Sequence, residues 1–305
     1  MEQTLPNSIR QLIIIPDEIL NYLSFTALIK NVPANNRETN YYQLPYLLHD
    51  FDFSYHYSSA LLGASNNKNT QRKLKDFVGF APKFEGRNST TRNLEYLEHN
   101  RDEVKIIDSI VGGKVFIDFN ATLHAFQDST DDYKIVHLAT HATCNDSLPF
   151  ESSIHFQEAS MPIYELYHLE QNLDMVVLSA CETGAGQLRK GEGIQSLARA
   201  FLQSNCKSVI TSLWKVNDEQ TPKIMSQFYQ NIFDKGQTKT AALATAQRSY
   251  LESNPISYAH PFYWATFIQI GDTQALYPTS IYWHLGIFSI VFILAFLFLL
   301  KLFFR

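Results

Sequence analysis

From residue 77 onward, the chain alternates between short apolar runs and longer amphipathic stretches. Nearly continuous apolar runs are typical of strands buried on both faces, and apolar residues at helical spacing are typical of the helices between them. Strands are predicted at residues 77–81, 114–118, 133–139, 173–179, 208–213 and 264–270. Helices are predicted at residues 94–111, 122–129, 194–203, 221–233 and 238–253. This order predicts an α/β fold, with a mainly parallel sheet flanked by helices on both faces.

The first part of the chain has a less regular pattern. Residues 10–15 form an apolar run that predicts a strand, and residues 17–30 carry apolar positions that fit a helix. The Tyr and Phe residues at 41–57 favour packing between subdomains over a surface for stacking bases. We therefore expect residues 1–100 to pack as an N-terminal portion against a second portion at residues 101–275.

The C-terminal segment has the composition of a membrane span. Residues 281–300 contain no Asp, Glu, Lys or Arg. A helix of roughly 20 residues, at about 1.5 Å per residue, spans about 30 Å, which is the thickness of the hydrocarbon core of a bilayer. Tyr282 and Trp283 suit one membrane interface, and the basic residues that follow the run suit the other. A buried core helix is the alternative, but such helices are usually shorter, so a transmembrane helix is predicted at residues 281–304.

The N-terminus bears on the location of the large part of the chain that precedes the span. The apolar run at residues 13–15 is cut off by Pro16 and is too short for a signal peptide, so this part is expected in the cytoplasm. Lys301 and Arg305 lie beyond the span, against the tendency of basic residues to stay cytoplasmic, but two charges carry little weight. The expectation is a membrane protein with one C-terminal span.

Charge and cysteine content narrow the function classes. The 305 residues carry a formal net charge of -5 and no basic stripe, so nucleic-acid binding is not expected. The three cysteines do not suggest a disulfide framework, and a reducing compartment is the default expectation.

Two of the predicted strands end in reactive side chains. His141 follows the strand at 133–139, and Cys181 follows the strand at 173–179. If these strands are parallel neighbours, both side chains emerge at one edge of the sheet. The imidazole can then lower the pKa of the thiol from about 8.5, and act as a base and later as an acid. Backbone N–H groups of Ala142 and Cys181 can stabilise the oxyanion.

The residues alone leave other interpretations open. A buried structural cysteine and a hydrogen-bonded core histidine would give the same pattern as a catalytic pair. A metal site with His137, His141 and Cys144 is disfavoured, because zinc usually takes four ligands and His137 should face away from His141. Cys144 and Cys206 are expected to be inert. The glycine fingerprint of a dinucleotide loop fails at Arg189, and no cofactor is expected.

Several stretches, in order, resemble the CHAT domain, a bacterial branch of the caspase-like peptidases that also includes separases. They are IIIPDEILNYLSFTALI, HLATHATCN, MVVLSACETGAG, KGEGIQSLARAFLQS, SVITSLWKVNDEQT and HPFYWATFIQIGD. The resemblance covers about residues 10–271 and implies a caspase-like sheet, with residues 1–100 as a degenerate first half. It also implies that His141 and Cys181 are the catalytic dyad of a cysteine endopeptidase that cleaves a protein substrate.

Two further residues are candidates for substrate binding. Some caspase relatives that cleave after basic residues carry an acidic residue two positions before the nucleophile, where this chain has Ser179. That position therefore gives no support for a preference for Arg or Lys. Asp218 either lines the substrate pocket or caps the helix that begins at Thr221.

The resemblance also bears on partners and on the biological role. Catalytic domains of this family often adjoin helical repeats that sense a partner. The given sequence contains no such repeats, so we expect either a separate regulatory partner or a further region upstream of this sequence. By family analogy alone, a membrane-anchored peptidase fits a defence or cell-death effector. Two alternatives stay open: a catalytically silent membrane scaffold, and a thiol redox sensor that would need a resolving cysteine near Cys181.

Overall fold

The computed structural model describes residues 6, 8–31, 40–59, 75–84, 94–144, 148, 151–169, 172–179, 182–183 and 193–277. Two predicted features lie outside these residues, namely the nucleophile Cys181 and the transmembrane helix at 281–304. Within the described part of the chain, no helix is both long and apolar enough to cross a bilayer.

The described chain is organised around one large sheet. Its eight strands lie in the order β1 (Gln11–Ile14), β2 (Asp52–Tyr55), β12 (Phe267–Gly271), β11 (Ser208–Ser212), β9 (Met175–Leu178), β5 (Tyr133–Leu138), β3 (Lys75–Pro82) and β4 (Lys114–Asp118). Neighbouring strands are parallel except for the antiparallel pair of β11 and β12. The predicted mainly parallel α/β sheet is therefore confirmed.

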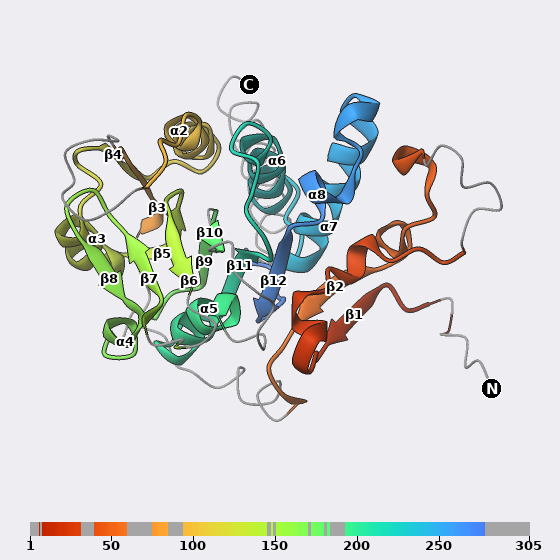
Figure 1. Cartoon of the computed structure of the whole chain (residues 1–305), viewed down its shortest axis with the longest axis horizontal. Helices are drawn as coiled ribbons and strands as arrows, with labels where there is room; N and C mark the ends of the chain where they lie inside the picture. Colours follow the sequence, from red (N-terminus) through yellow and green to blue (C-terminus); the bar gives the residue numbers. More distant parts are fainter. Residues whose placement is uncertain are drawn as a thin grey trace, which may run out of the picture.

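Helices cover both faces of this sheet (Figure 1). One layer contains α2 (Asn100–Val111), α6 (Thr221–Phe233) and α7 (Lys239–Ser253), and the other contains α3 (Leu123–Ser129), α4 (Ile163–Leu166) and α5 (Gly193–Gln203). Strand side chains alternate between the layers: Ile135 packs in the core cluster of α6 and α7, whereas Val136 and Leu138 pack in the cluster of α3 and α5. The continuous apolar runs in the sequence reflect this burial on both faces.

A second, smaller sheet follows β5. It has four strands in the order β10 (Glu182–Thr183), β6 (Ala142–Cys144), β7 (Ser153–His155) and β8 (Ser160–Pro162). β6 pairs in parallel with β10 and antiparallel with β7. The sequence analysis did not predict this sheet, which begins at the residue after His141.

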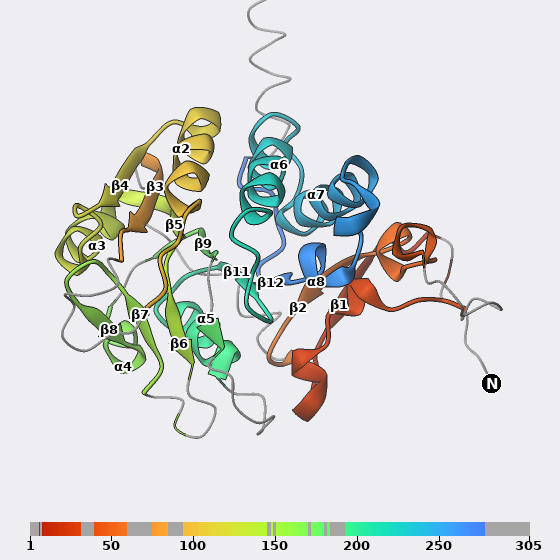
Figure 2. The same cartoon turned by 45° about the horizontal axis from the view of Figure 1, so that its top comes forward.

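The N-terminal portion extends the large sheet, because β2 pairs with β12 (Figure 2). The helix predicted at 17–30 is wrong: two short 3-10 helices, Glu18–Tyr22 and Phe25–Ala27, occupy this stretch. The phenol of Tyr55 accepts from the Phe25 N–H at 2.9 Å and donates to the Leu23 carbonyl at 3.2 Å, so it bonds backbone groups between the two turns. The division at residue 100 stays a prediction.

Short elements complete the described fold. They are the 3-10 helices Tyr41–Gln43, Leu47–His49, Thr130–Asp132 and Ile256–Tyr258, and the single-turn helix α8 (Pro261–Trp264).

Candidate active site

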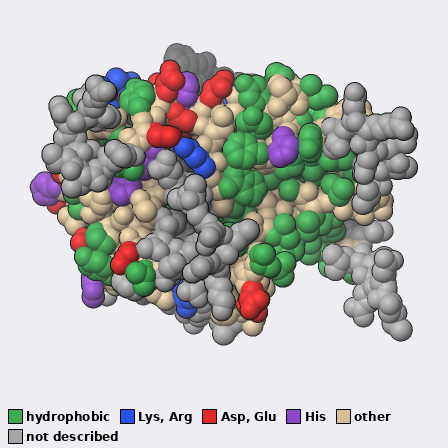
Figure 3. Space-filling model, in the orientation of Figure 1, with side chains coloured by type: hydrophobic (Ala, Val, Ile, Leu, Met, Phe, Trp, Pro, Cys, Tyr) green, Lys and Arg blue, Asp and Glu red, His purple; other side chains and the backbone are tan. Residues whose placement is uncertain are grey.

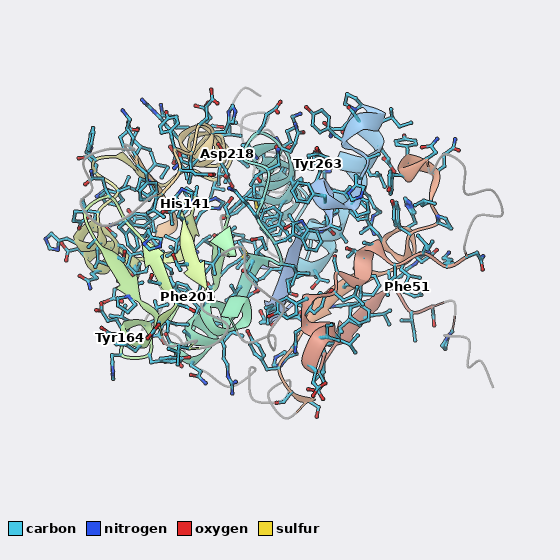
Figure 4. All side chains as sticks on the ribbon, in the orientation of Figure 1. Phe51, His141, Tyr164, Phe201, Asp218 and Tyr263 are labelled. Atoms are coloured by element: carbon cyan, nitrogen blue, oxygen red, sulfur yellow. The ribbon has the colours of Figure 1, made fainter. Side chains whose placement is uncertain are left out.

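The strands that lead to the predicted dyad are neighbours in the sheet. β5 and β9 are parallel, with Leu138 opposite Leu178, and the Ser179 N–H donates to the Leu138 carbonyl at 3.0 Å. Position 141 lies three residues beyond Leu138, and position 181 lies three residues beyond Leu178. The two strands therefore deliver the chain to the same edge of the sheet, where His141 lies (Figure 4).

Cys181 itself lies outside the described residues, but residues on both sides of it are described. Ser179 is bonded to the end of β5, and Glu182 pairs with Thr143 in the small sheet. The chain before and after position 181 thus runs beside the chain before and after His141.

His141 is buried and held by two neighbours. Its ring packs against Phe84, with ring centroids 5.0 Å apart, and its Nε2 lies 2.7 Å from the Glu95 carbonyl oxygen. Because a carbonyl oxygen can only accept, Nε2 must carry the proton in this bond. In the neutral ring, Nδ1 is then the nitrogen that can accept a proton.

The segment that supplies this carbonyl departs from its predicted structure. A helix was predicted from residue 94, but α2 begins only at Asn100. The Glu95 carbonyl is bonded to His141 instead of to a helical N–H group. The Glu95 side chain is exposed and pairs with Lys215 at 2.6 Å, and this bond is the main reason why the pKa of Glu95 is lowered.

Asp218 holds the same segment from the other side. Its carboxylate accepts from the His99 N–H at 2.8 Å. It does not cap α6, because the N-cap is Gln220, whose N–H is bonded by the Asn217 side chain at 3.0 Å. Asp218 therefore connects the loop after β11 to the start of α2, and its contact with a substrate stays a prediction.

The first turn of α2 is tied to the strand ends by Asn100. Its buried side-chain amide donates to the Pro82 carbonyl at 2.9 Å and to the Ala139 carbonyl at 3.1 Å. Asn100 thus links the ends of β3 and β5 to the helix.

The Ser179 side chain is also directed to α2. Its hydroxyl is buried and donates to a carboxylate oxygen of Glu103. His137 shares that carboxylate, with Nε2 3.0 Å from Oε1, and its Nδ1 lies 3.2 Å from the Tyr229 hydroxyl. His137 is therefore a hydrogen-bonded core histidine in the layer of α2 and α6.

The remaining candidates are placed as follows. Ala142 is buried as the first residue of β6, and its role as an oxyanion donor stays a prediction. Cys206 is buried, and burial raises the pKa of its thiol to about 12, which supports the expectation that it is inert. The backbone of Cys144 lies opposite Thr183, but its side chain is outside the described part, so the redox hypothesis stays a prediction. Among the described residues, no group of His, Cys, Asp or Glu side chains is arranged to hold a metal ion.

A cavity of about 180 Å³ lies next to the segment that holds His141, at the carboxyl ends of β3 and β4. Its lining consists of Lys83, Tyr96, Leu97, Glu98, Asn100, Arg101, Asp102, Asp118 and Phe119. Arg101 and Asp118 form an ion pair at 3.3 Å. Figure 3 shows several acidic side chains close together in the region of α2.

Sequence reasoning missed Glu95, Asn100 and Glu103. Glu95 acts through its backbone, so its side chain carries no signal. Asn100 and Glu103 look like ordinary first-turn residues of an amphipathic helix. Only the spatial arrangement shows that they contact the strand ends.

A family model described as the CHAT domain matches residues 1–272. Tetratricopeptide repeat protein 28 of Homo sapiens is 28% identical over 126 residues, which cover 41% of this chain and 5% of that protein. The chain therefore spans only a small part of the length of this relative.

Two solved structures of a cysteine proteinase share the fold. The Arg-specific cysteine proteinase gingipain R superposes with a TM-score of 0.50 at 10% identity, covering 74% of this chain and 55% of that chain. The complex of Porphyromonas gingivalis RgpB pro- and mature domains gives a TM-score of 0.56 at 10% identity, covering 88% of this chain and 66% of that chain. At this identity the similarity concerns the caspase-like fold alone.

Proposed function

Because the chain belongs to the CHAT domain family, we propose that it is a cysteine endopeptidase that cleaves a protein substrate through an acyl-enzyme on Cys181. His141 is the general base and acid. The observation that carries this proposal is the pairing of β5 with β9, in which Leu138 lies opposite Leu178. Both proposed dyad members follow these paired residues by the same number of positions.

The described contacts of His141 suit this chemistry. Nδ1 takes the proton of the Cys181 thiol, and the thiolate attacks the scissile carbonyl carbon. The imidazolium then gives its proton to the leaving amine, and water hydrolyses the thioester. The Glu95 carbonyl accepts from Nε2 throughout, and this bond strengthens when the ring is charged. The N–H groups of Ala142 and Cys181 bind the oxyanion.

We assign Ser179 and Asp218 to the substrate-binding region, where their side chains hold neighbouring segments. The Ser179 hydroxyl is bonded to Glu103, and the Asp218 carboxylate is bonded to the His99 N–H. The Ser179 position therefore predicts no preference for basic residues in the substrate.

We propose that residues 281–304 anchor the protein in a membrane and that the catalytic part lies in the cytoplasm. We also propose that a separate partner regulates the protein. Tyr277 donates to Asp76 at 2.5 Å, and Lys134 contacts the same carboxylate at 2.5 Å. Asp76 and Lys134 lie at the amino ends of β3 and β5, whereas His141 follows the carboxyl end of β5. Tyr277 therefore lies near the end of β5 opposite to His141, roughly 20 Å away for a six-residue strand. A defence or cell-death role rests on family analogy alone.

A peptide-library cleavage profile tests the proposed activity, with Cys181→Ala as the blank. We expect cleavage by the wild type, and a loss of at least about 100-fold in kcat/KM for His141→Ala. Cys206→Ala is the matched control. It removes a buried thiol that has no proposed part in the reaction, so cleavage should be unchanged. Cleavage that persists in Cys181→Ala would refute the proposal.

A catalytically silent scaffold is the second candidate, because His141 exposes only 2% of its surface and a substrate carbonyl has to reach it. Labelling with a thiol-reactive peptide electrophile separates the two functions. Preferential labelling of Cys181 over Cys144 and Cys206 supports the peptidase. Equal or absent labelling of Cys181 supports the scaffold.

A further inference from the structure

Four buried polar side chains form one hydrogen-bonded network between the central strands and the helices α2 and α6. Ser179 at the end of β9 donates to Glu103 of α2, Glu103 contacts His137 of β5 at 3.0 Å, and His137 contacts Tyr229 of α6 at 3.2 Å. None of the four exposes more than 3% of its surface. Because buried polar groups are costly when unpaired, every member of this network depends on its neighbours.

One arrangement of hydrogens satisfies all of these contacts. Burial, and then the negative charge of Glu103, raise the pKa of Tyr229 well above its usual value, so its phenol stays protonated and donates to Nδ1 of His137. Nε2 of His137 then carries a proton and donates to Glu103. The Ser179 hydroxyl donates to the same carboxylate, which accepts both bonds.

The same helical turn carries a second contact with the strand ends. Asn100 and Glu103 are three residues apart in α2, so they lie on one face of the helix. Asn100 binds the carbonyl of Ala139, which lies two positions before His141. Glu103 binds the hydroxyl of Ser179, which lies two positions before Cys181. Each half of the proposed dyad is thus preceded, at the same distance along the chain, by a residue anchored to α2.

We propose that Asn100 and Glu103 form a positioning pair that sets the relative placement of His141 and Cys181. This inference deepens the proposed peptidase function and rests on it. Asn100 acts through the Ala139 carbonyl, and Glu103 acts through the Ser179 hydroxyl, so each holds a residue two positions before a member of the dyad. Ser179 is held twice, because its N–H donates to Leu138 of β5 and its hydroxyl donates to α2. Fixing these segments reduces the freedom that the two reacting groups would otherwise have to lose.

The test compares Ser179→Ala with Asn100→Ala in the full chain held in detergent micelles. The readout is the rate of alkylation of Cys181 by iodoacetamide as a function of pH, followed by mass spectrometry. Each variant should lower the alkylation rate near pH 7 by about tenfold. This factor corresponds to the free energy of about one hydrogen bond that no longer helps to place His141 and Cys181. The inflection of the pH profile should move toward the value of an ordinary thiol, because His141 is less well placed to stabilise the thiolate.

Ser204→Ala is the matched control. Ser204 is a buried serine whose hydroxyl donates to the Leu166 carbonyl at 2.6 Å and to the Ala200 carbonyl at 2.7 Å, in the layer of α4 and α5. This variant should lose stability while the alkylation profile of Cys181 keeps its wild-type inflection. Ser179→Thr, which keeps the hydroxyl, should restore most of the rate that Ser179→Ala loses.

The outcomes separate this inference from the proposed function. If Cys181 in the wild type shows the same profile as in His141→Ala, the dyad fails and the positioning pair fails with it. If the dyad is present but Ser179→Ala and Asn100→Ala match Ser204→Ala, only the positioning pair is overturned. If one of the two variants does not fold, the profile of the other decides.

Discussion

The replacement of Asn100 by Ala gives a prediction that depends on only two hydrogen bonds. The Asn100 amide donates to the Pro82 and Ala139 carbonyls, and its side chain is buried. Asn100→Ala leaves two buried carbonyl oxygens without this donor. Each buried group that loses its partner costs about 1–3 kcal/mol, so for two groups we expect a total loss of about 2–6 kcal/mol in the free energy of unfolding. Domains are typically stable by about 5–15 kcal/mol, so this loss is readily measured.

Urea unfolding followed by circular dichroism measures this loss, with an unchanged dependence on denaturant as a check on two-state behaviour. Asn21→Ala is the matched control, because half-buried Asn21 makes the same kind of bond to the Glu18 carbonyl, at 2.8 Å, and this bond is exposed to solvent. The control should change stability by no more than about 0.5 kcal/mol.

Asn100→Asp sharpens the test, because it keeps the shape of the side chain but replaces the donor by an acceptor. It should cost at least as much stability as Asn100→Ala at neutral pH, since carboxylate oxygens would then face two carbonyl oxygens. Equal stability of wild type and Asn100→Asp would refute the assigned direction of these hydrogen bonds. A loss below about 0.5 kcal/mol in Asn100→Ala would refute their energetic role.

Two further predictions concern titratable groups away from the dyad. Burial raises the pKa of Cys206 to about 12, so native protein should resist alkylation of this thiol at pH 8, whereas protein unfolded in urea should react; labelling in the native state would contradict the assignment. Burial tends to raise the pKa of Asp76, but hydrogen bonds from Lys134 and Tyr277 outweigh it and lower the pKa below 3.8. The stabilisation from this carboxylate is therefore present above the pKa of the unfolded state and is lost as pH falls through the lowered folded value. Hydrogen-exchange protection of residues 273–277 should hold down to about pH 4 and fall below that pH. The Asp76→Asn variant should show weak protection at neutral pH. Unchanged protection in that variant would refute the stabilisation of this segment by Asp76.

The order of the main elements could be predicted from the sequence because burial on two faces leaves a strong signal. Strands inside the sheet are mostly apolar, as in β5, or wholly apolar, as in β9. Amphipathic helices such as α6 lie at the expected residues. The carboxyl-end rule for parallel sheets then identified the edge at which His141 lies. This part of the site followed from pattern and topology alone.

Other parts could not be predicted because their signals are weak or non-local. The strands of the small sheet are two or three residues long, too short for periodicity to identify. The helix predicted from residue 94 starts later, since the Glu95 carbonyl bonds to His141, a residue distant in the sequence. The roles of Asn100 and Glu103 depend on which strand ends lie beside α2, which no local pattern encodes. The roles of Cys181 and of residues 281–304 stay predictions.

The pH dependence of Cys181 alkylation, compared between wild type and His141→Ala, tests most directly whether the imidazole activates the thiol. The account predicts a wild-type inflection well below the ordinary thiol value of about 8.5, and a return to about that value in His141→Ala. Identical profiles for the two proteins, with an inflection near 8.5 in both, would contradict the proposed dyad.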